Sequence, residues 1–368
     1  MLEVQKIIKN NPFNWEYHLE KPPYNLKIGR NDGYIILKYS QIESDFSKQV
    51  VRESRGIILD EENDYEVVCK AFDKFFNYGE ELAASIDWKT AKIHEKLDGS
   101  IHKLWFSKKF KKWIVSTNGT IYAQNANVMF PKNGITNFYE MFMEAYNKKE
   151  LVGSPAKNAT HVFELVGPQN RVVIPYEEIE LFYLTSVNNE TLEEYEDNAF
   201  KKFPVPLSYY FNSLEETIDF TKSEGFNTFR NEGFVVKDGN FNRIKIKTED
   251  YLRIHRMRGE TNPTPLRFLE LMRTNEQEEF LSYFPEYQSE YDSFKEKYIN
   301  YRRKLDGLTD YFCSIKDLDR KEFAMKAKET FCPSYLFGLL DDKYSVASEY
   351  MQQMRDKNLI EAIMKEIE

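Results

Sequence analysis

The spacing of apolar residues changes once along this chain of 368 residues, near residue 248. Before that point, short runs such as Tyr34–Tyr39 and Arg243–Lys247 are rich in β-formers, and the second alternates with the period of a strand. From residue 249 onward, apolar residues recur at helical intervals and strand alternation almost disappears. The change predicts an α+β protein with a β-rich domain over residues 1–248 and an all-α domain over residues 249–368.

The composition supports two folded domains and limits where they function. Hydrophobic residues make up 41% of the chain and aromatic residues 15%, enough for two cores. No run of 18 apolar residues is present, so the sequence predicts no membrane segment, and Met1–Asn10 lacks the apolar core of a secretory signal. The three cysteines have no paired spacing, which predicts a reducing, cytoplasmic setting without structural zinc. A net charge of −9 argues against general coating of nucleic acid but permits local basic clefts.

Patterning places several helices and strands along the chain. In the first domain the predicted helices are Leu2–Lys9, Gln124–Phe130, Thr136–Lys148 and a helix from the capping box at Ser213 to about Ser223. The predicted strands are Tyr34–Tyr39, the hairpin of Arg55–Leu59 with Tyr65–Cys69, Trp113–Thr117, His161–Val166, Ile179–Val187 and the hairpin of Gly233–Lys237 with Arg243–Lys247. The predicted helices of the second domain are Leu266–Met272, Ser289–Leu305, Lys321–Thr330, Leu336–Leu340 and Val346–Ile367.

The tetrapeptide Lys96–Gly99 lies between two strand-like runs, where we expect one strand to end and its hairpin partner to begin. An amine there can act as a nucleophile only when uncharged, so its pKa must fall from about 10.4 through burial or nearby cations. The alternative is an ordinary turn with a solvated lysine. The same four residues recur at Lys304–Gly307 in a charged, helical segment, where Asp306-Gly307 predicts the end of a helix.

Other charged residues each allow two interpretations. Lys245 and Lys247 project from one face of a strand, where they either hold an anion or form a solvated strand edge. Glu164 lies in an apolar run and either faces a site or simply points to solvent by alternation. The mixture of cations and aromatic rings in Lys70–Glu80 indicates either a strand edge above a core or phosphate contacts beside a stacking ring. The basic cluster Lys108–Lys112 is typical of a solvated hairpin tip.

Neither a P-loop nor a dinucleotide fingerprint is present, so lysine and arginine side chains would have to hold any nucleotide. If Lys96 attacks the α-phosphate of ATP, cations must spread the phosphate charge and carboxylates must hold a hydrated metal ion. The cations available for the first role are Arg55, Lys74, Lys245 and Lys247, and the carboxylates for the second are Glu164 and Glu232.

Together these residues resemble the covalent nucleotidyltransferases, a superfamily of ATP-dependent DNA and RNA ligases and mRNA capping enzymes. Four stretches are similar to its motifs and occur in the same order, namely Lys96–Gly99, Phe163-Glu164, Glu232–Val235 and Lys245–Lys247. Within the superfamily the chain resembles most the phage-type RNA ligase 1 family, through Arg55–Ile57, Lys74–Asn77, Glu95–Ser100, Pro168–Val173, Asp319–Met325 and Leu336–Gly338. The resemblance spans nearly the whole chain and is strongest over residues 52–247.

The resemblance implies an adenylyltransferase domain with antiparallel sheets over residues 1–248 and a helical domain over residues 249–368 that reads RNA or tRNA. It implies a monomeric, cytoplasmic, ATP-dependent RNA ligase, in the host cytoplasm if a phage encodes it. The ligase would join 5′-phosphate and 3′-hydroxyl ends of single-stranded RNA or nicked tRNA loops. Lys96 would carry AMP. The residues implied to bind ATP are Tyr39 (with Lys38 as the alternative), Arg55, Lys74, Phe76, Glu95, Gly99, Glu164, Glu232, Lys245 and Lys247. Those implied at a Mg²⁺ or Mn²⁺ ion are Asp98, Glu164 and Glu232.

Four points leave alternatives open. Asn118 stands where the family pattern predicts a basic residue before Gly119, which puts the contribution of that turn in doubt. A DNA ligase or capping enzyme would share the first chemical step, but the resemblance then implies a β-barrel where this chain is helical. A non-catalytic RNA-binding repair protein would keep the fold without the chemistry. For the helical domain, the alternative to RNA recognition is a packing module that stabilises the first domain.

Overall fold

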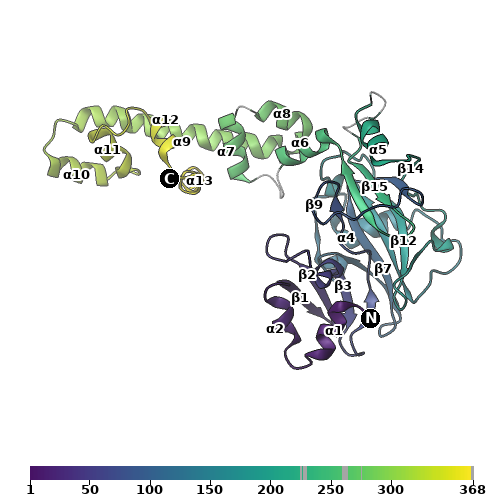
Figure 1. Cartoon of the computed structure of the whole chain (residues 1–368). Coiled ribbons are helices and arrows are strands. Elements are labelled where there is room, and N and C mark those ends of the chain that lie inside the picture. The colour runs from purple at the N-terminus through teal and green to yellow at the C-terminus, as the bar shows by residue number, and fades with distance from the viewer. Residues whose placement is uncertain (224–225, 227–229, 259–263, 275, 366–368) are drawn as a thin grey trace. The chain divides into compact units, whose positions relative to one another are not determined.

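Three sheets built mainly from antiparallel strands organise the first part of the chain, as a computed structural model shows (Figure 1). The structure describes residues 1–368 except 224–225, 227–229, 259–263, 275 and 366–368. It divides into two units, Met1–His255 and Arg256–Glu368. Sheet I has the order β1 (Leu26–Asn31), β2 (Tyr34–Tyr39), β3 (Arg55–Asp60), β4 (Glu66–Cys69).

The other two large sheets have five strands each. Sheet II has the order β13 (Glu194–Tyr195), β12 (Glu180–Asn188), β11 (Ala159–Val166), β7 (Ser100–Ser107), β8 (Lys112–Thr117). Sheet III has the order β14 (Ser208–Tyr209), β6 (Lys92–Glu95), β15 (Gly233–Lys237), β16 (Arg243–Lys247), β5 (Phe76–Asn77), with β5 parallel to β16. A separate two-stranded pair joins β9 (Asn127–Lys132) and β10 (Ile135–Asn137).

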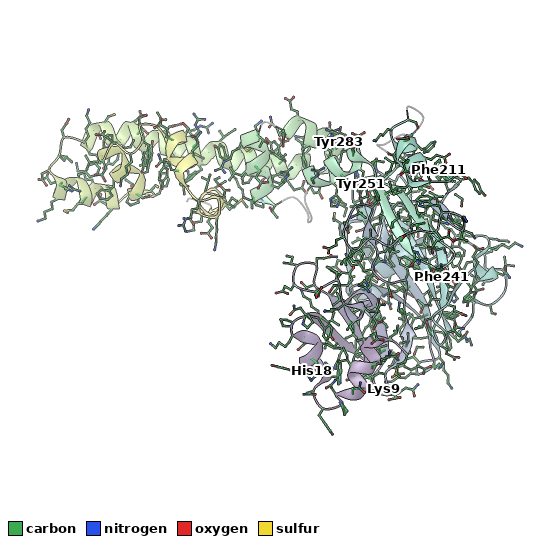
Figure 2. The ribbon with its side chains drawn as sticks, in the orientation of Figure 1. Lys9, His18, Phe211, Phe241, Tyr251 and Tyr283 are labelled. Carbon is green, nitrogen blue, oxygen red and sulfur yellow. The ribbon has the colours of Figure 1, made fainter. Side chains whose placement is uncertain are left out.

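Helices cover the outer faces of these sheets. The helices of the first unit are α1 (Glu3–Asn10), α2 (Trp15–Glu20), α3 (Gln49–Glu53), α4 (Phe138–Tyr146) and α5 (Leu214–Thr221), with 3₁₀ turns η1 (Ala123–Asn125), η2 (Pro168–Asn170) and η3 (Asn198–Phe200); α6 (Glu249–Arg258) crosses into the second unit. Residues of α1–α3 pack on one face of sheet I, and α4 packs on one face of sheet II. The side chains of Phe211 (labelled in Figure 2) and α5 cover one face of sheet III. Sheets II and III therefore each have one face left to bound a site.

The second unit is helical throughout its described residues. Its helices are α7 (Pro265–Thr274), α8 (Gln277–Tyr283), α9 (Gln288–Ile315), α10 (Arg320–Lys328), α11 (Pro333–Leu340), α12 (Ala347–Gln353) and α13 (Asp356–Met364), with a 3₁₀ turn η4 (Pro285–Tyr287). The long helix α9 buries Tyr301, Leu305 and Leu308 on one side. None of the helices in the described part of the chain is both long and apolar enough to cross a membrane.

The predicted α+β class is confirmed, with antiparallel sheets first and helices afterwards. The two hairpins predicted for Arg55–Cys69 and Gly233–Lys247 form, and Ser213 caps α5 by accepting a hydrogen bond from the Glu216 N–H (3.2 Å). The predicted hairpin tip at Lys108–Lys112 also lies where expected, between β7 and β8.

Three local predictions are wrong. Residues 124–130 form η1 and part of β9 instead of a helix, because Val128 is buried and Asn127 pairs with β10. Asp306-Gly307 does not end a helix but lies inside α9. An interior glycine costs only about 1 kcal/mol, which the burial of the flanking Leu305 and Leu308 outweighs. The predicted helix Val346–Ile367 is divided into α12 and α13, and its last two residues lie outside the described residues.

Asp238 holds the turn between β15 and β16. Its carboxylate accepts hydrogen bonds from the N–H groups of Asn240 (2.9 Å), Asn242 (2.9 Å) and Asp87 (3.1 Å) and from the side-chain amide of Asn242 (3.0 Å). The side chain is buried, so its removal strands these donors.

We therefore expect Asp238→Ala to lower the free energy of unfolding by about 1–3 kcal/mol, measured by chemical denaturation. Asp219→Ala is the control, because Asp219 is exposed on α5. An equal effect of the two substitutions would contradict the assigned role of the turn.

Candidate active site

The loop Lys96–Gly99 crosses from sheet III to sheet II. The strand before it, β6, pairs with β14 and β15, whereas the strand after it, β7, pairs with β11 and β8. The predicted hairpin between these two strands is therefore wrong. The N–H of Lys96 continues the ladder by donating to the carbonyl of Gly233 (2.8 Å), so the side chain lies where the two sheets diverge.

Gly99 is the point where this crossing touches sheet II. A Cβ at this residue would lie 2.5 Å from the carbonyl oxygen of Leu165 and 2.8 Å from a methyl carbon of Val166. Only glycine lets the loop approach β11 this closely. The close approach places Lys96 beside Glu164, which is the neighbour of Leu165 on β11.

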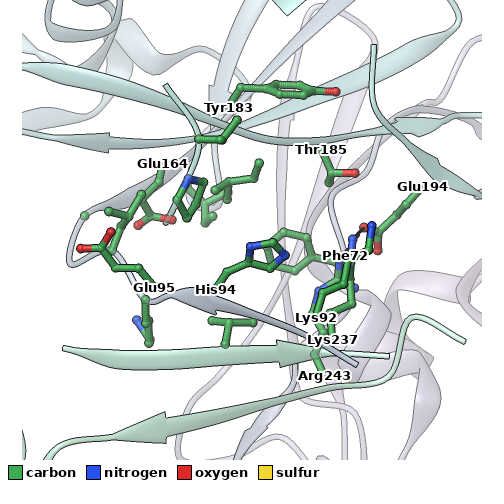
Figure 3. Close-up of a pocket in the computed structure, with 18 of the residues that line it drawn as sticks. Phe72, Lys92, His94, Glu95, Glu164, Tyr183, Thr185, Glu194, Lys237 and Arg243 are labelled. Carbon is green, nitrogen blue, oxygen red and sulfur yellow. Dashed lines mark hydrogen bonds and ion pairs between the residues drawn. The ribbon is translucent and has the colours of Figure 1, made fainter. Parts of the chain in front are cut away.

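A cavity of ≈ 1220 Å³ lies between the free faces of sheets II and III. Figure 3 shows it with Glu164 and Glu95 at one end and Lys92, Lys237, Arg243 and Glu194 at the other. The predicted site residues that line it are Arg55, Glu95, Lys96, Gly99, Glu164 and Lys245. The chain thus brings together residues from β3, β6, β11 and β16 that are up to 190 positions apart in sequence, since Arg55 and Lys245 share this wall.

Glu232 binds two of the predicted lysines at once. One carboxylate oxygen accepts from Lys96 Nζ (2.5 Å) and the other pairs with Lys247 Nζ (2.9 Å). Only 2% of the Glu232 side chain is exposed, so the charges meet in a desolvated position. Glu232 and Lys247 do not line the cavity themselves but lie directly behind Lys96.

The pKa of Lys96 differs from the predicted direction. Burial alone would lower it, but the negative charges of Glu232 and Glu164 outweigh burial and raise the pKa above its usual value. The prediction that surrounding cations lower this pKa is therefore wrong for this structure, because the carboxylates are closer. Lys96 is held as an ammonium group and must lose its proton before it can attack.

Glu164 has the opposite perturbation. Burial, reinforced by the charge of Glu232 and opposed by Lys96, raises the pKa of Glu164 to about 7. Its carboxyl is poised near neutral pH to exist in either protonation state. Burial similarly raises the pKa of Glu95, whose N–H donates to the carbonyl of Leu207 (2.8 Å).

Arg55 and Lys245 form the cationic wall opposite these acids. Burial and the neighbouring charges of Arg55 and Lys96 lower the pKa of Lys245 to about 7. The guanidinium of Arg55 lies over the rings of Phe72 and Phe75 (5.1 and 5.8 Å). Its Nη1 is buried without a hydrogen-bond partner among the described residues. An unsatisfied buried cationic donor lining a cavity fits a phosphate oxygen.

Asp98 is occupied by the fold itself. Its carboxylate accepts hydrogen bonds from the N–H groups of Val173 (2.7 Å) and Ile174 (2.8 Å) and from the hydroxyl of Tyr251 (2.7 Å). Its own N–H donates to the hydroxyl of Tyr176 (3.2 Å). Because both oxygens are engaged, Asp98 fixes the loop in this structure rather than offering the predicted metal ligand.

Sequence reasoning did not single out these partners of Asp98. Tyr251, labelled in Figure 2, lies on α6 and also packs its ring under Lys247 Nζ (4.9 Å). The only available signal was its position four residues after Lys247, one helical turn beyond a strand end. Asp98 and Tyr251 are 153 residues apart, so local sequence patterns could not predict their contact.

Tyr39, Lys74 and Phe76 do not line the cavity. They form a separate cluster around Phe46, in which Lys74 Nζ lies over the rings of Tyr39 (5.1 Å), Phe46 (4.4 Å) and Phe76 (5.5 Å). Burial, followed by the charge of Arg55, lowers the pKa of Lys74, so the cluster is electrostatically linked to the cavity wall.

The alternative to Tyr39 is closer to the cavity. Lys38 Nζ donates to the carbonyl of Gly119 (2.9 Å), a residue of the cavity wall. Asn118, next to it, also lines the cavity, and its side-chain oxygen is buried without a hydrogen-bond partner among the described residues. Lys38 thus places a positive charge beside the turn that lacks the expected basic residue.

The acids of the site suit a hard divalent cation. Within the described residues, no three His, Cys, Asp or Glu side chains form a metal cluster. Magnesium is usually bound by one or two carboxylates together with substrate phosphates. Glu164 and Glu232, whose charges act on the same Lys96 amine, meet that requirement as oxygen donors.

Comparison with known proteins agrees with this arrangement. Residues 53–251, more than half of the chain, match the family described as RNA ligase. The chain belongs to this RNA ligase family. The match and the relatives confirm the resemblance to the phage-type RNA ligase 1 group.

Two relatives and one solved structure illustrate the range of similarity. A bifunctional polynucleotide kinase/RNA ligase of Autographa californica nuclear polyhedrosis virus is 31% identical over 310 residues, which cover 78% of this chain and 42% of that protein. The chain therefore spans less than half the length of that relative. An RNA ligase of Rhodothermus phage RM378 is 26% identical over 413 residues, and the match covers 91% of this chain and 91% of that protein. An archaeal ATP-dependent RNA ligase has a TM-score of 0.43 at 11% identity, over 68% of this chain and 66% of that one.

The raised pKa of Glu164 makes stability depend on pH. The folded chain keeps this proton up to about pH 7, whereas the unfolded chain releases it near about pH 4.3. Stability therefore falls as pH rises through this interval, and Glu164→Gln should remove the fall. Relative to the wild type, we expect the variant to gain on the order of 1–3 kcal/mol in free energy of unfolding between about pH 4 and pH 8, measured by chemical denaturation.

The control is Glu178→Gln, an exposed glutamate whose substitution should leave the pH dependence unchanged. A Glu164→Gln effect that is constant with pH would contradict the raised pKa.

Removing the negative charge of Glu232 should release Lys96 as a free amine. In Glu232→Gln, burial and the now unopposed charge of Lys247 both disfavour the ammonium form. We expect the pH at which acetic anhydride modifies Lys96 to shift to lower values, as followed by peptide mass spectrometry. Glu215→Gln, on the exposed side of α5, is the matched control. If the pH midpoint of Lys96 acetylation does not change, Glu232 does not keep the Lys96 amine protonated.

Proposed function

We propose that this chain is an ATP-dependent RNA ligase that joins a 5′-phosphate end to a 3′-hydroxyl end through AMP bound covalently to Lys96. The observation that carries the proposal is the position of the Lys96 amine. It lies in a cavity at the junction of two sheets, 2.5 Å from the carboxylate of Glu232, with Glu164 and Lys245 on the walls. Membership in the RNA ligase family supports the same chemistry.

The first step forms a bond between Lys96 Nζ and the α-phosphorus of ATP and breaks the bond from that phosphorus to the pyrophosphate oxygen. The lysine proton leaves toward the carboxylates that face it, Glu232 and Glu164. The site favours this transfer because the raised pKa of Glu164 makes it a competent acceptor near neutral pH. Arg55 and Lys245 stabilise the charge that builds on the phosphate oxygens.

In the second step, an oxygen of the RNA 5′-phosphate attacks the phosphorus of lysyl-AMP, and the P–N bond breaks as Lys96 regains a proton. In the third step, the RNA 3′-hydroxyl attacks the activated 5′-phosphorus, loses its proton and displaces AMP. Both steps are displacements at phosphorus, for which alignment and charge stabilisation supply most of the rate. Lys245 remains on the cavity wall throughout, where it can neutralise the transferred phosphate.

A magnesium or manganese ion held by Glu164 and Glu232 would neutralise phosphate charge and compete with the Lys96 ammonium for these carboxylates. We propose that Lys74, Phe76 and Tyr39 support the cationic wall formed by Arg55 and Lys245. We assign Asp98 and Gly99 to positioning of the Lys96 loop. Asp98 gives up the predicted metal role because its oxygens are engaged.

We also propose the natural RNA substrate and the roles of the two domains, on the basis of the family resemblance. Residues 1–248 act as the adenylyltransferase domain and the helical residues 249–368 select RNA, with nicked tRNA loops as the substrate in RNA repair. The enzyme acts as a monomer on single-stranded ends. Competition between labelled RNA and DNA ends in a sealing assay separates this function from that of a DNA ligase.

Labelling with α-labelled ATP tests the covalent step. We expect the wild type to form a labelled adduct that survives denaturing electrophoresis and Lys96→Ala to lose it completely, because Lys96 is the only amine among the described residues that both lines the cavity and pairs with Glu232. Lys304→Ala is the matched control, since it alters the same tetrapeptide on the exposed side of α9. Label retained by Lys96→Ala, or lost in a folded Lys304→Ala variant, would refute the assignment.

A further inference from the structure

The strands of sheet III place a second row of cations on the cavity face, away from Lys96. Strand pairing sets Lys92 opposite Lys237 and Lys237 opposite Arg243. The next row along the same face is His94, Val235 and Lys245, and the one after it is formed by Lys96, Gly233 and Lys247. Because side chains on one face recur every second residue, the rows are ordered along the strands. We call Lys92, Lys237 and Arg243 the distal row.

All three side chains of the distal row line the cavity. Figure 3 shows them gathered at the end away from Glu164, with His94 between the two ends. Like charges directly opposite one another in a sheet repel. Burial and the charge of Arg243 lower the pKa of Lys237, which is the expected result of such crowding. The row is therefore an electrostatic cost to the fold unless an anion compensates it.

The acids nearby compensate only part of this charge. Glu194 from β13 pairs with Arg243 and lies 3.8 Å from Lys237 Nζ. Glu196 also lines this end of the cavity. Lys92 has no ion-pair partner in the described part of the chain, and neither has Lys201, a further cation of the cavity wall. Asp197 is a third acid of the cavity wall, so four cations face three acids and the distal end keeps a surplus of positive charge.

Exposed aromatic rings flank these cations. Tyr210 is 92% exposed, Phe241 (labelled in Figure 2) 44% and Tyr195 37%, and all three line the same cavity. Single exposed rings are common on protein surfaces, but several exposed rings gathered at one cavity indicate a surface that binds a partner. Cations that follow a backbone beside rings on which bases can stack are the common arrangement for binding single-stranded nucleic acid.

The distal row is too far from Lys96 to serve the phosphates of the reacting ATP. Four residues separate Lys92 from Lys96, which is about 14 Å along a strand. The β- and γ-phosphates follow the α-phosphorus by two P–O–P bridges, a much shorter reach. When the α-phosphorus of ATP lies at Lys96, the ATP phosphates do not reach the distal row. The row is therefore available to another phosphate.

We propose that the distal row, together with the rings of Tyr210 and Phe241, is a binding site for a phosphate and the adjoining bases of the single-stranded RNA substrate. This inference rests on the proposed function, because it names where that enzyme holds its RNA. The phosphate is an internal phosphodiester of the RNA, because the terminal 5′-phosphate must reach the phosphorus of lysyl-AMP at Lys96, about 14 Å along the strand from Lys92.

The test measures binding of a fluorescent single-stranded RNA to the full chain by anisotropy over a series of salt concentrations. In Lys92→Gln/Lys237→Gln, we expect weaker binding and a salt slope of log affinity reduced by about 0.7 for each RNA phosphate that the variant no longer neutralises. In Glu194→Gln, which removes the compensating acid, we expect tighter binding and a steeper slope. Lys92→Gln/Lys237→Gln should weaken the binding of 5′-phosphorylated RNA and of 5′-hydroxyl RNA equally, because the distal row contacts an internal phosphate. A loss confined to the 5′-phosphorylated RNA would contradict this assignment.

Lys111→Gln/Lys112→Gln is the control, since it removes the same charge at the exposed tip between β7 and β8. Adduct formation with ATP reports separately on the proposed function. If the wild type forms the adduct and seals RNA while the distal-row variants bind RNA with an unchanged salt slope, the distal site is refuted and the ligase stands. A raised KM for ATP in these variants would assign the row to ATP instead. If the double variant fails to fold, Lys92→Gln alone and Glu194→Gln decide, because their expected effects are opposite in sign.

Discussion

The buried carboxylate of Glu232, shared between Lys96 and Lys247, is the interaction on which the site depends. Two ammonium groups this close repel each other, and a buried unpaired charge costs several kcal/mol, so the three groups are stable only together. Glu232 precedes β15, Lys247 ends β16 and Lys96 follows β6. The same contact therefore fixes the ends of three neighbouring strands and the position of Lys96, the proposed nucleophile.

The charge balance that stabilises the fold also restrains the chemistry. Glu232 and Glu164 raise the pKa of Lys96, whereas attack on phosphorus requires the neutral amine. Lys245 is pushed in the opposite direction, to a pKa of about 7, by burial and by surrounding cations. A polyphosphate that binds beside Lys245 and Arg55 supplies the negative charge that these two cations lack. The arrangement thus resists reaction until a ligand redistributes the charge.

The sequence alone identified the charged residues of the site, but it did not predict how most of them are held in place. Glu164 could be singled out because it interrupts an apolar strand pattern, and Lys245 and Lys247 because alternation sets them on one face. Glu232 could be singled out because Glu232–Val235 resembles a family motif. The contacts of Asp98 with Val173, Ile174 and Tyr251 could not, since they join segments distant in sequence through backbone N–H groups and a hydroxyl. Local pattern also could not tell that β6 and β7 belong to different sheets, because each strand finds its partners far along the chain.

The crossing between sheets explains why the same tetrapeptide has two fates in one chain. At Lys304–Gly307 the residues continue α9, where Leu305 is buried and Lys304 stays exposed. At Lys96–Gly99, Leu97 and Asp98 are buried and Gly99 touches the backbone of Leu165, so the chain is pulled from one sheet to the other and the lysine is left in the gap. The tetrapeptide itself does not determine reactivity. What distinguishes Lys96 from Lys304 is that two sheets are anchored around it, one through the Gly233 carbonyl and the other through β11.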